Sequence, residues 1–453
     1  MNFSRLVWIW NLLRSSLWFV PSVMTIGALV LVMIGNYVDR HYRFELKDYF
    51  LFFYQGGPEG ARQILSTIAG SMITVAGVTF SITIVALSLA SQQFGPRLLQ
   101  NFMRDRANQM VLGTFIATFI YCLAVLPTIR GTEDYAFVPY FSVMIGVGGA
   151  IASLAVLIYF IHHVSHSIQA DVVVRVVSEE FEDSIDRIYP EQLEGEEGDD
   201  ERGRAALESL RNIPFRDLKS GKSGYVQFVD GKSLSDHCCE QDIIASVRVR
   251  PGDFVTKGMA MVRVWAPPEI SDDDLDDIHD AFIIGTSRTT RQDVEFAVLQ
   301  LVEVAVRSLS PGINDPFTAV ACVDRIHQGM VKLVNRPFPS PYRFDDSKKL
   351  RLVTKPFDFP GLCDVAFNQM RQYGSSSVTV TLRLLETITR LIERTERTDR
   401  IAPLIAHGRM ILHAGERMTE EERDLEDMRN RFERLLEAAR KIEARGARIE
   451  IAN

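Results

Sequence analysis

Five hydroxyl side chains fall on one face of a long apolar segment near the start of the chain. They recur at steps of three, four or seven residues: Thr67, Ser71, Thr74, Ser81 and Ser88. A helix places residues at these steps on the same side. Hydroxyl dipoles can replace part of an ion's hydration shell, so this face could line an ion conduit. Alternatively, it could pack closely against other membrane helices or line an internal substrate cavity.

Basic residues flank the same segment. Arg62 precedes it, and Arg97 ends the string SQQFGPR, in which a Gly-Pro pair is expected to stop the helix. In a symmetric oligomer, Arg62 and Arg97 would each form a ring of positive charge at one mouth of the conduit. Such rings raise the local concentration of anions. The alternative is that both are ordinary basic residues beside a span, and Glu59 could cancel the charge of Arg62.

A second group of polar residues lies far along the chain. Arg288 begins the string RTTRQD, and residues 310–316 read SPGINDP, in which six of seven residues are typical of turns. These strings predict a sharply shaped corner, in which Asp315 caps a helix that starts with proline. The alternative is that Arg288, Asn314 and Asp315 contact a ligand or another subunit.

No motif of enzyme chemistry accompanies these residues. The sequence contains no nucleophile–base signature, glycine-rich phosphate loop, zinc motif or dinucleotide fingerprint. We therefore expect no catalytic residue, cofactor or metal site, and no enzyme activity. The five cysteines are too few and too scattered for a disulfide framework, which favours a reducing compartment for the charged part of the chain.

The elements that must hold the hydroxyl face are membrane spans. Four stretches lack Asp, Glu, Lys and Arg, and each exceeds the roughly 20 residues that a helix needs to cross a bilayer. We predict four transmembrane helices, at residues 17–36, 65–90, 109–129 and 137–161. The second charge-free stretch has 34 residues, about 51 Å as a helix, so it must tilt or project beyond the bilayer.

Charge divides the chain into two unlike parts. Residues 1–170 hold 10 Lys/Arg and 7 Asp/Glu, whereas the remaining 283 residues hold 40 and 51. This distribution excludes a single soluble globule and a disordered chain. It also argues against nucleic acid as a partner, since no basic surface dominates. The lipid bilayer is the expected partner of the first part.

Basic residues in the short loops indicate the orientation. Arg97, Arg104 and Arg106 lie between the second and third spans, whereas Arg130 is the one basic residue between the third and fourth. Cytoplasmic loops carry the excess of Lys and Arg. The first loop also holds four basic residues and weakens the contrast, but the count favours a cytoplasmic N-terminus. An even number of spans then places the C-terminus in the cytoplasm too.

The cytoplasmic part is predicted to be an α+β region. After the transmembrane domain, 1–170, we expect a helix and an acidic linker at 171–222. A small β-barrel-like module follows at 223–268 and a helical domain at 269–415. The last segment, 416–453, reads as one charged helix.

The β module resembles half of a biotinyl/lipoyl-like barrel. The resemblance rests on residues 249–258, VRPGDFVTKG. The carrier function is not expected, because Lys232, which we place at a hairpin, lacks the flanking residues of a modified lysine. We interpret the module as a structural spacer.

The C-terminal helix carries an apolar seam. Its residues alternate at steps of four and three, as in a coiled coil: Leu425, Met428, Phe432, Leu435, Ala439 and Ile442. This seam could join two or more subunits, or it could pack on its own domain.

Three strings carry a resemblance to a known family. They are SQQFGPR at 91–97, RTTRQD at 288–293 and SPGINDPFT at 310–318. In these strings and in the order of its elements, the chain resembles a widespread family of bacterial inner-membrane proteins that carry a domain of unknown function. The resemblance spans nearly the whole chain. It implies a multi-pass protein of the bacterial inner membrane, and it implies no reaction or ligand.

Three hypotheses of function follow. The first is a homo-oligomeric channel in which the second span lines an ion conduit, with a weak preference for anions, and the cytoplasmic part forms a vestibule or gate. The second is a membrane-anchored scaffold or sensor whose cytoplasmic modules bind proteins. The third is a small-solute transporter, although no internal repeat supports it.

Overall fold

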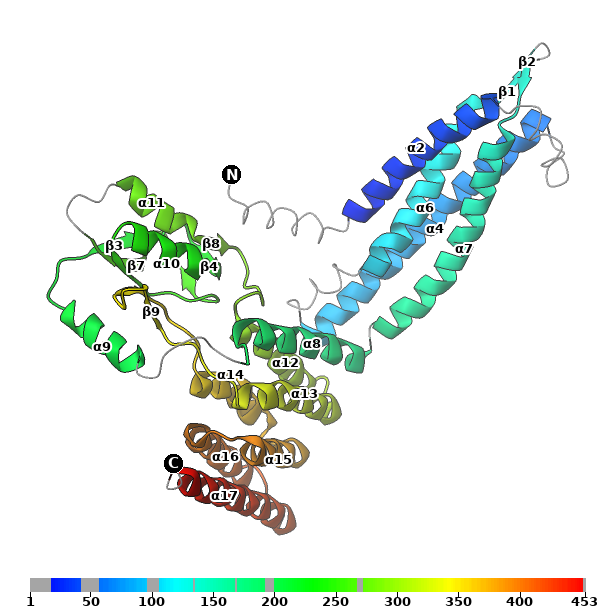
Figure 1. The fold of residues 1–453 in the computed structure, drawn as a ribbon. Coiled ribbons are helices and arrows are strands. Elements are labelled where there is room, and N and C mark those ends of the chain that lie inside the picture. Colours follow the sequence, from blue (N-terminus) through cyan, green and yellow to red (C-terminus); the bar gives the residue numbers. More distant parts are fainter. Residues whose placement is uncertain are drawn as a thin grey trace. The chain divides into compact units, whose positions relative to one another are not determined.

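The computed structural model describes residues 18–41, 57–95, 106–132, 135–167, 169–191, 199–266 and 272–450. The chain divides into two units, residues 1–172 and 173–453 (Figure 1). We call the first the membrane unit, because its long helices are apolar enough to cross a bilayer.

Among the described residues, the membrane unit contains four such helices, and they coincide with the four predicted spans. They are α2 (Phe19–His41), α4 (Gly57–Phe94), α6 (Arg106–Val125) and α7 (Tyr140–Ser167). The helix α6 packs against each of the other three and is the most buried of them. A short turn, η2 (Leu126–Thr128), and a hairpin of β1 (Arg130–Thr132) and β2 (Tyr135–Phe137) connect α6 to α7.

Small residues inside the bundle allow the helices to approach closely. A Cβ atom on Gly146 of α7 would lie 2.8 Å from the Leu65 side chain of α4. A Cβ on Gly113 of α6 would lie 2.5 Å from the sulfur of Met24 on α2. Close contact through glycine is typical of membrane helix pairs, where no water drives apolar surfaces together.

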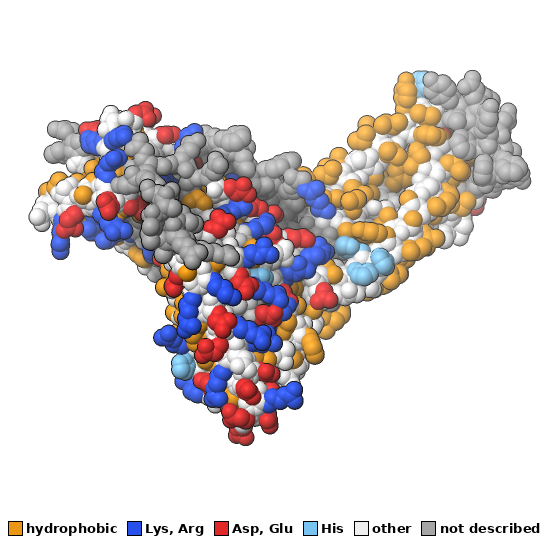
Figure 2. All heavy atoms as spheres, turned by 60° about the horizontal axis from the view of Figure 1, so that its bottom comes forward, with side chains coloured by type: hydrophobic (Ala, Val, Ile, Leu, Met, Phe, Trp, Pro, Cys, Tyr) orange, Lys and Arg blue, Asp and Glu red, His pale blue; other side chains and the backbone are white. Residues whose placement is uncertain are grey.

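Surface composition follows the same division. Figure 2 shows hydrophobic side chains along the membrane helices, and Lys, Arg, Asp and Glu intermixed over the second unit. Exposed Ile, Leu and Val side chains on α2, α4 and α7 suit contact with lipid tails.

The second unit begins within the helix α8, at residue 173, and continues with a region of mixed helices and strands. The helices are α8 (Ala170–Ile188), α9 (Asp199–Ser209), α10 (Gly231–Glu240) and α11 (Asp272–Asp280). One sheet has the order β3 (Arg216–Lys219), β7 (Ala260–Trp265), β5 (Ile244–Val247), β10 (Leu350–Val353) and β9 (Tyr342–Phe344). The other has the order β6 (Phe254–Val255), β4 (Gly224–Val229) and β8 (Phe282–Gly285).

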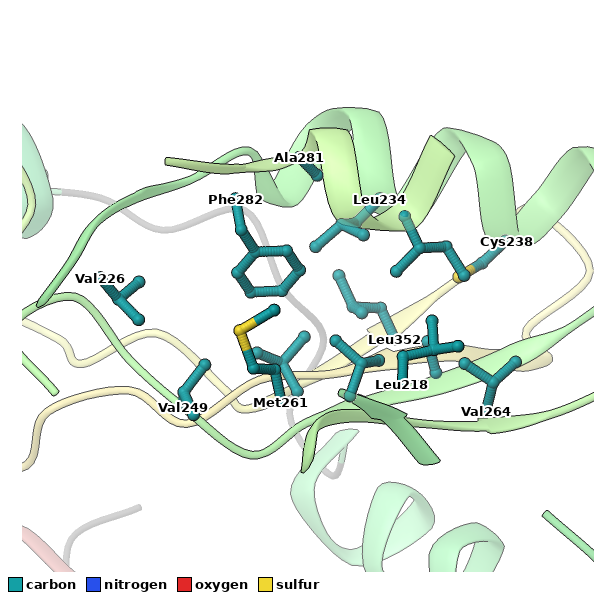
Figure 3. Packing of buried hydrophobic residues seen from close by; sticks show 14 of the residues in the cluster. Leu218, Val226, Leu234, Cys238, Val249, Met261, Val264, Ala281, Phe282 and Leu352 are labelled. Atoms are coloured by element: carbon teal, nitrogen blue, oxygen red, sulfur yellow. The ribbon is translucent and has the colours of Figure 1, made fainter. Parts of the chain in front are cut away.

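The predicted barrel is not confirmed, because both described sheets are open. The strand β10 pairs in parallel with β5, so the larger sheet recruits a segment about a hundred residues downstream. Helix α10 covers the core: Leu234 and Cys238 lie over Met261 and Leu352 (Figure 3). The placement of Lys232 at a hairpin was also wrong. Lys232 lies in the first turn of α10, because the Asp230 carboxylate accepts a hydrogen bond from Ser233 N (3.1 Å) and caps a helix there.

The rest of the second unit is helical. It contains α12 (Val294–Ser308), α13 (Pro316–Val334), α14 (Phe359–Gly374), α15 (Val378–Arg394), η3 (Thr398–Arg400), α16 (Ile401–Glu416) and α17 (Glu422–Glu450). Aspartates Asp293, Asp315 and Asp358 cap α12, α13 and α14, and each accepts backbone N–H groups of the first turn.

The C-terminal helix α17 packs on its own unit. It lies against α15 and α16, and Met428, Leu435 and Ala439 of the predicted seam are buried there. Gly415 and Gly408 on α16 make room for Met428 and Leu435. Of the two alternatives for the seam, the structure therefore shows the intramolecular one.

Candidate functional site

The hydroxyl face of α4 is exposed on the outside of the membrane bundle. Thr67, Ser71, Thr74, Ser81 and Ser88 are all exposed. The buried residues of the helix, which include Leu65, Ala69, Ala76 and Thr79, lie on nearly the opposite side, given about 100° per residue. The hydroxyl groups therefore do not hold the four helices of one chain together.

The hydroxyl groups are partly satisfied within α4 itself. Thr74 Oγ1 donates to Gly70 O at 2.8 Å, and Ser81 Oγ donates to Gly77 O at 2.9 Å. Each hydroxyl oxygen keeps lone pairs that can accept a bond or face a cation. Val78 and Val85 continue the same face, so its second half is less polar than its first.

Two glycines border the hydroxyl face. At Gly70 and Gly77, a Cβ atom would meet no other atom within 4 Å. A glycine inside a helix costs about 0.5–1 kcal/mol relative to alanine. None of the described residues occupies the space above Gly70 and Gly77, so packing among them does not explain these two glycines.

The arginine at the start of α4 is engaged by its neighbours. Arg62 Nη2 donates to the carbonyl oxygen of Ile129 at 3.0 Å, and Arg62 Nη1 lies 3.5 Å from Glu59 Oε2. The Glu59 carboxylate offsets the charge of the guanidinium, as the sequence had suggested. The other proposed mouth residue, Arg97, lies outside the described residues.

A buried carboxylate near the end of α2 was not predicted. Asp39 Oδ1 accepts a hydrogen bond from Phe141 N (2.8 Å), and Asp39 Oδ2 accepts from Ser142 N (3.0 Å) and Ser142 Oγ (2.6 Å). These groups form the first turn of α7, whose N–H groups have no partners within the helix. Asp39 therefore caps α7 from another helix, and a separation of a hundred residues hides this role in the sequence.

The string RTTRQD forms a joint between the sheet and the helices. Arg288 makes two hydrogen bonds to Asp293, at 2.7 and 2.8 Å, and Asp293 is 1% exposed. The Gln292 side-chain amide bonds to both N and O of Val229 at the end of β4. Thr290 Oγ1 donates to Glu180 on α8. The pairing partners of Arg288 and Gln292 thus lie within the protein.

Two carboxyl groups at this joint are electrostatically perturbed. Burial raises the pKa of Asp293 above its ordinary value, and the hydrogen bonds from Arg288 oppose that shift. Burial likewise raises the pKa of Glu295, whose Oε1 accepts from Arg250 Nη2 at 2.7 Å. Both carboxyl groups are already paired with arginines, which favours a structural role.

The SPGINDP corner lies at the other end of α12. The 15 residues of α12 separate it from Arg288, a length of about 22 Å. Asn314 adopts a left-handed conformation (φ 51°), and Asp315 accepts from Phe317 N, Thr318 N and Thr318 Oγ1. These bonds, the Thr318 hydroxyl first, lower the pKa of Asp315. The structure thus does not bring Arg288 together with Asn314 and Asp315.

Comparison with known proteins places the chain in a family. Two proteins of Mycobacterium tuberculosis strains and one of Mycobacterium bovis, each titled an uncharacterized protein, are 30% identical over 429 residues, covering 91% of this chain and 78% of theirs. No solved structure gives a significant match. The model of one family, described as "Predicted membrane protein (DUF2254)", matches residues 14–390. The chain is therefore a member of the DUF2254 family of membrane proteins.

Proposed function

We propose that this protein is a homo-oligomeric channel in which α4 lines an ion conduit. The observation that carries the proposal is the position of the hydroxyl face on the outer surface of the bundle, opposite the buried side of α4. A conduit between subunits requires polar groups on such an outward face.

The length of α4 supports the same proposal. Its 38 residues make a helix of about 57 Å, almost twice the roughly 30 Å of bilayer hydrocarbon. A helix of this length can line both the membrane part of a conduit and its entrance. The second unit would then form a vestibule or gate.

A weak preference for anions follows from the flanking charges. Because Glu59 offsets the charge of Arg62, the proposed anion preference rests mainly on Arg97. A ring of arginines at one mouth raises the local concentration of anions and repels cations. The preference should weaken with salt, since the Debye length is only about 8 Å at physiological ionic strength.

We propose that both termini are cytoplasmic and that the protein resides in the bacterial inner membrane. The test is cysteine labelling in intact cells, with Arg211→Cys as the reporter in a Cys239→Ser background. Arg211 is exposed on the second unit. Cys239 is the exposed cysteine that the background removes, and the remaining four cysteines are buried. An impermeant reagent should label Arg211→Cys only after the cells are opened. Labelling in intact cells would reverse the proposed orientation.

The conduit is tested by single-channel recording of the full-length protein in planar bilayers. Ser71→Leu and Thr74→Leu should reduce or abolish conductance, because each places an apolar side chain on the proposed lining. Ser165→Leu is the matched control, since Ser165 is exposed on α7 and, like Thr74, donates to a carbonyl oxygen of its own helix. Arg97→Glu should shift the reversal potential in a salt gradient toward cation preference.

One observation favours the scaffold hypothesis instead. The hydroxyl groups of Thr74 and Ser81 already donate to carbonyl oxygens within α4, so these two side chains need no water or ion. If the reconstituted protein conducts under no voltage, tension or pH step, the channel proposal fails. It also fails if the Ser71→Leu and Thr74→Leu variants conduct as well as Ser165→Leu. In either case, α4 is a packing helix in a membrane-anchored scaffold or sensor.

A further inference from the structure

The turn between α12 and α13 presents large apolar side chains to solvent. Phe317 is 79% exposed and Ile313 is 41% exposed. Among the large hydrophobic side chains of the described residues, Phe317 has the highest exposure, above even Trp18 (75%) at the start of α2. An exposed phenylalanine is unfavourable in water, so this position calls for an apolar environment.

The apolar side chains stand on a rigid turn. Asn314 adopts its left-handed conformation, and the Asp315 carboxylate accepts from the backbone N–H groups of Phe317 and Thr318. The N–H of Asp315 donates to Ser308 O at 2.7 Å, which ties the turn back to the end of α12. The exposure of Phe317 is thus a feature of a fixed turn. We call residues 313–317 the apolar corner.

Ion pairs between α8 and α13 show that these helices run in the same direction. Lys332 Nζ lies 2.7 Å from Glu182 Oε2, and one turn farther along, Arg336 Nη2 lies 2.6 Å from Asp186 Oδ1. Phe181, the residue before Glu182, fills the space above Gly329, which lies three residues before Lys332. The residue numbers rise together on both helices. The beginning of α8 therefore lies at the same end of the pair as the beginning of α13.

Helix α12 gives the same direction independently. Ser184 Oγ on α8 donates to Thr290 O at 3.1 Å, just before α12 begins, so the C-terminal half of α8 lies near the start of α12. The N-terminal half of α8 is packed as well, since Val173, Val174 and Val177 are buried. The start of α8 must then lie toward the end of α12, where the apolar corner begins.

The start of α8 is tied to the membrane by the chain itself. Helix α7 ends at Ser167 and α8 begins at Ala170. Three peptide steps reach at most about 10 Å. The 28 residues of α7 make a helix of about 42 Å, which matches the 40–45 Å of a bilayer with its headgroups. The first turn of α8 is therefore held near the bilayer surface.

We propose that the apolar corner inserts Ile313 and Phe317 into the interfacial layer of the bilayer, on the side where α7 ends. The partner is the lipid surface, because the corner lies at the end of its helices that the chain holds near the membrane. Proteins that lie on membranes bury Trp, Phe and Leu side chains at the boundary between the headgroups and the acyl chains. Tyr373, 58% exposed at the end of α14, lies at the same end of the helices, because Gly374 approaches Leu309. This proposal does not depend on ion conduction.

The test uses the full-length protein with an environment-sensitive fluorophore. Phe317→Cys, in a Cys239→Ser background, is labelled with a nitrobenzoxadiazole probe and reconstituted into phosphatidylcholine–phosphatidylglycerol vesicles. Ile313→Cys is a second position, which keeps the test valid if one variant misfolds. Phe254→Cys is the matched control. Phe254 is 54% exposed and lies toward the opposite end of α12, because the neighbouring Gly252 contacts Asp293.

Probes at positions 317 and 313 should emit at shorter wavelengths than the probe at position 254. Lipids that carry a doxyl group near the headgroup should quench the probes at 317 and 313 but not the probe at 254. Emission at 317 and 313 equal to that at 254 would overturn the proposal. So would a blue-shifted emission that doxyl lipids do not quench, because the corner would then be covered by protein, such as a second copy of this chain.

Discussion

The Arg288–Asp293 pair offers a sharp test of the joint between the sheet and the helices. Asp293→Ala removes one carboxylate that does two things: it accepts two hydrogen bonds from Arg288, and it caps α12 by accepting from Phe296 N at 2.9 Å. We expect the change to destabilise the N-terminal half of α12 strongly, because Asp293 is almost completely buried.

The magnitude follows from these two roles. Loss of an aspartate N-cap costs about 1 kcal/mol. Breaking a buried ion pair costs about 3–5 kcal/mol, because the remaining charge is left without its partner. The Arg288 side chain is 21% exposed and keeps Glu295 at 3.9 Å, which reduces the penalty. We expect a total near the lower end, about 3 kcal/mol.

Hydrogen–deuterium exchange of the full-length protein in detergent measures this loss locally. At 1.4 kcal/mol per factor of ten, amides of residues 296–304 should exchange roughly a hundredfold faster in Asp293→Ala. Asp293→Asn should lose less stability than Asp293→Ala. The amide oxygen of asparagine still accepts the cap bond, and the neutral amide does not pay the cost of burying a charge, which raises the pKa of Asp293. The control Arg211→Ala removes an exposed pair with Glu208 and should change nothing measurable. Exchange in Asp293→Ala within threefold of wild type would refute the reasoning.

Three further predictions concern single side chains. Burial lowers the pKa of His407 below its ordinary value of 6.5, so the unfolded state takes up the proton first as the pH falls. The stability of the fold should therefore drop as the pH falls below about 6.5, and His407→Gln should flatten this pH dependence in thermal melts. Gly329→Ala should lower the melting temperature, by a loss of about 1–3 kcal/mol, because its Cβ would lie 2.1 Å from the buried Phe181 ring. Gly77→Leu should weaken self-association in light scattering of the detergent-solubilised protein, while the same substitution at Gly27, an exposed glycine of α2 whose Cβ would also meet no atom within 4 Å, should not.

The spans could be predicted because the membrane imposes a simple rule. A charge-free stretch of more than 20 residues has few alternatives to a transmembrane helix, and each of the four stretches lies in a helix long and apolar enough to cross a bilayer. The helix ends were less predictable. Helix α2 continues to His41, five residues beyond the predicted end, and this extension contains Asp39. Its carboxylate is occupied by N–H groups of α7, a contact that no local pattern contains.

The barrel prediction failed because strand pairing is not local. The turns around residues 249–258 suggested a closed repeat, but the neighbour of β5 is β10, through Leu352 opposite Ala245. The turn residue Gly252 does adopt the expected positive φ (97°), so its local conformation was predictable from the sequence. The packing of Gly252 against Asp293 was not predictable, because Asp293 lies at the start of a helix about forty residues later in the sequence.

The strings RTTRQD and SPGINDP illustrate the same limit. Both strings were recognisable as specialised, and Asp315 caps α13 as expected. Their grouping into one ligand site was not supported, because a straight 15-residue helix stands between Arg288 and Asn314. The exposed phenylalanine beside Asp315 could have been noticed, but exposure depends on the packing of α8, α12 and α13. Sequence periodicity alone does not show which apolar residue remains uncovered.

The arrangement of α4 reconciles oligomerisation with conduction. A single helix face cannot both pack against a neighbouring subunit and line a conduit. Measured around the axis of α4 from Thr67, Ser71 and Thr74 lie within about 40°, whereas Gly70 and Gly77 lie about 60–80° to one side. In the proposed ring, the glycine edge would receive the backbone of the next subunit, because none of the described residues occupies that space. The hydroxyl groups of Thr67, Ser71 and Thr74 would then face the axis, and the two demands would fall on adjacent sides of one helix.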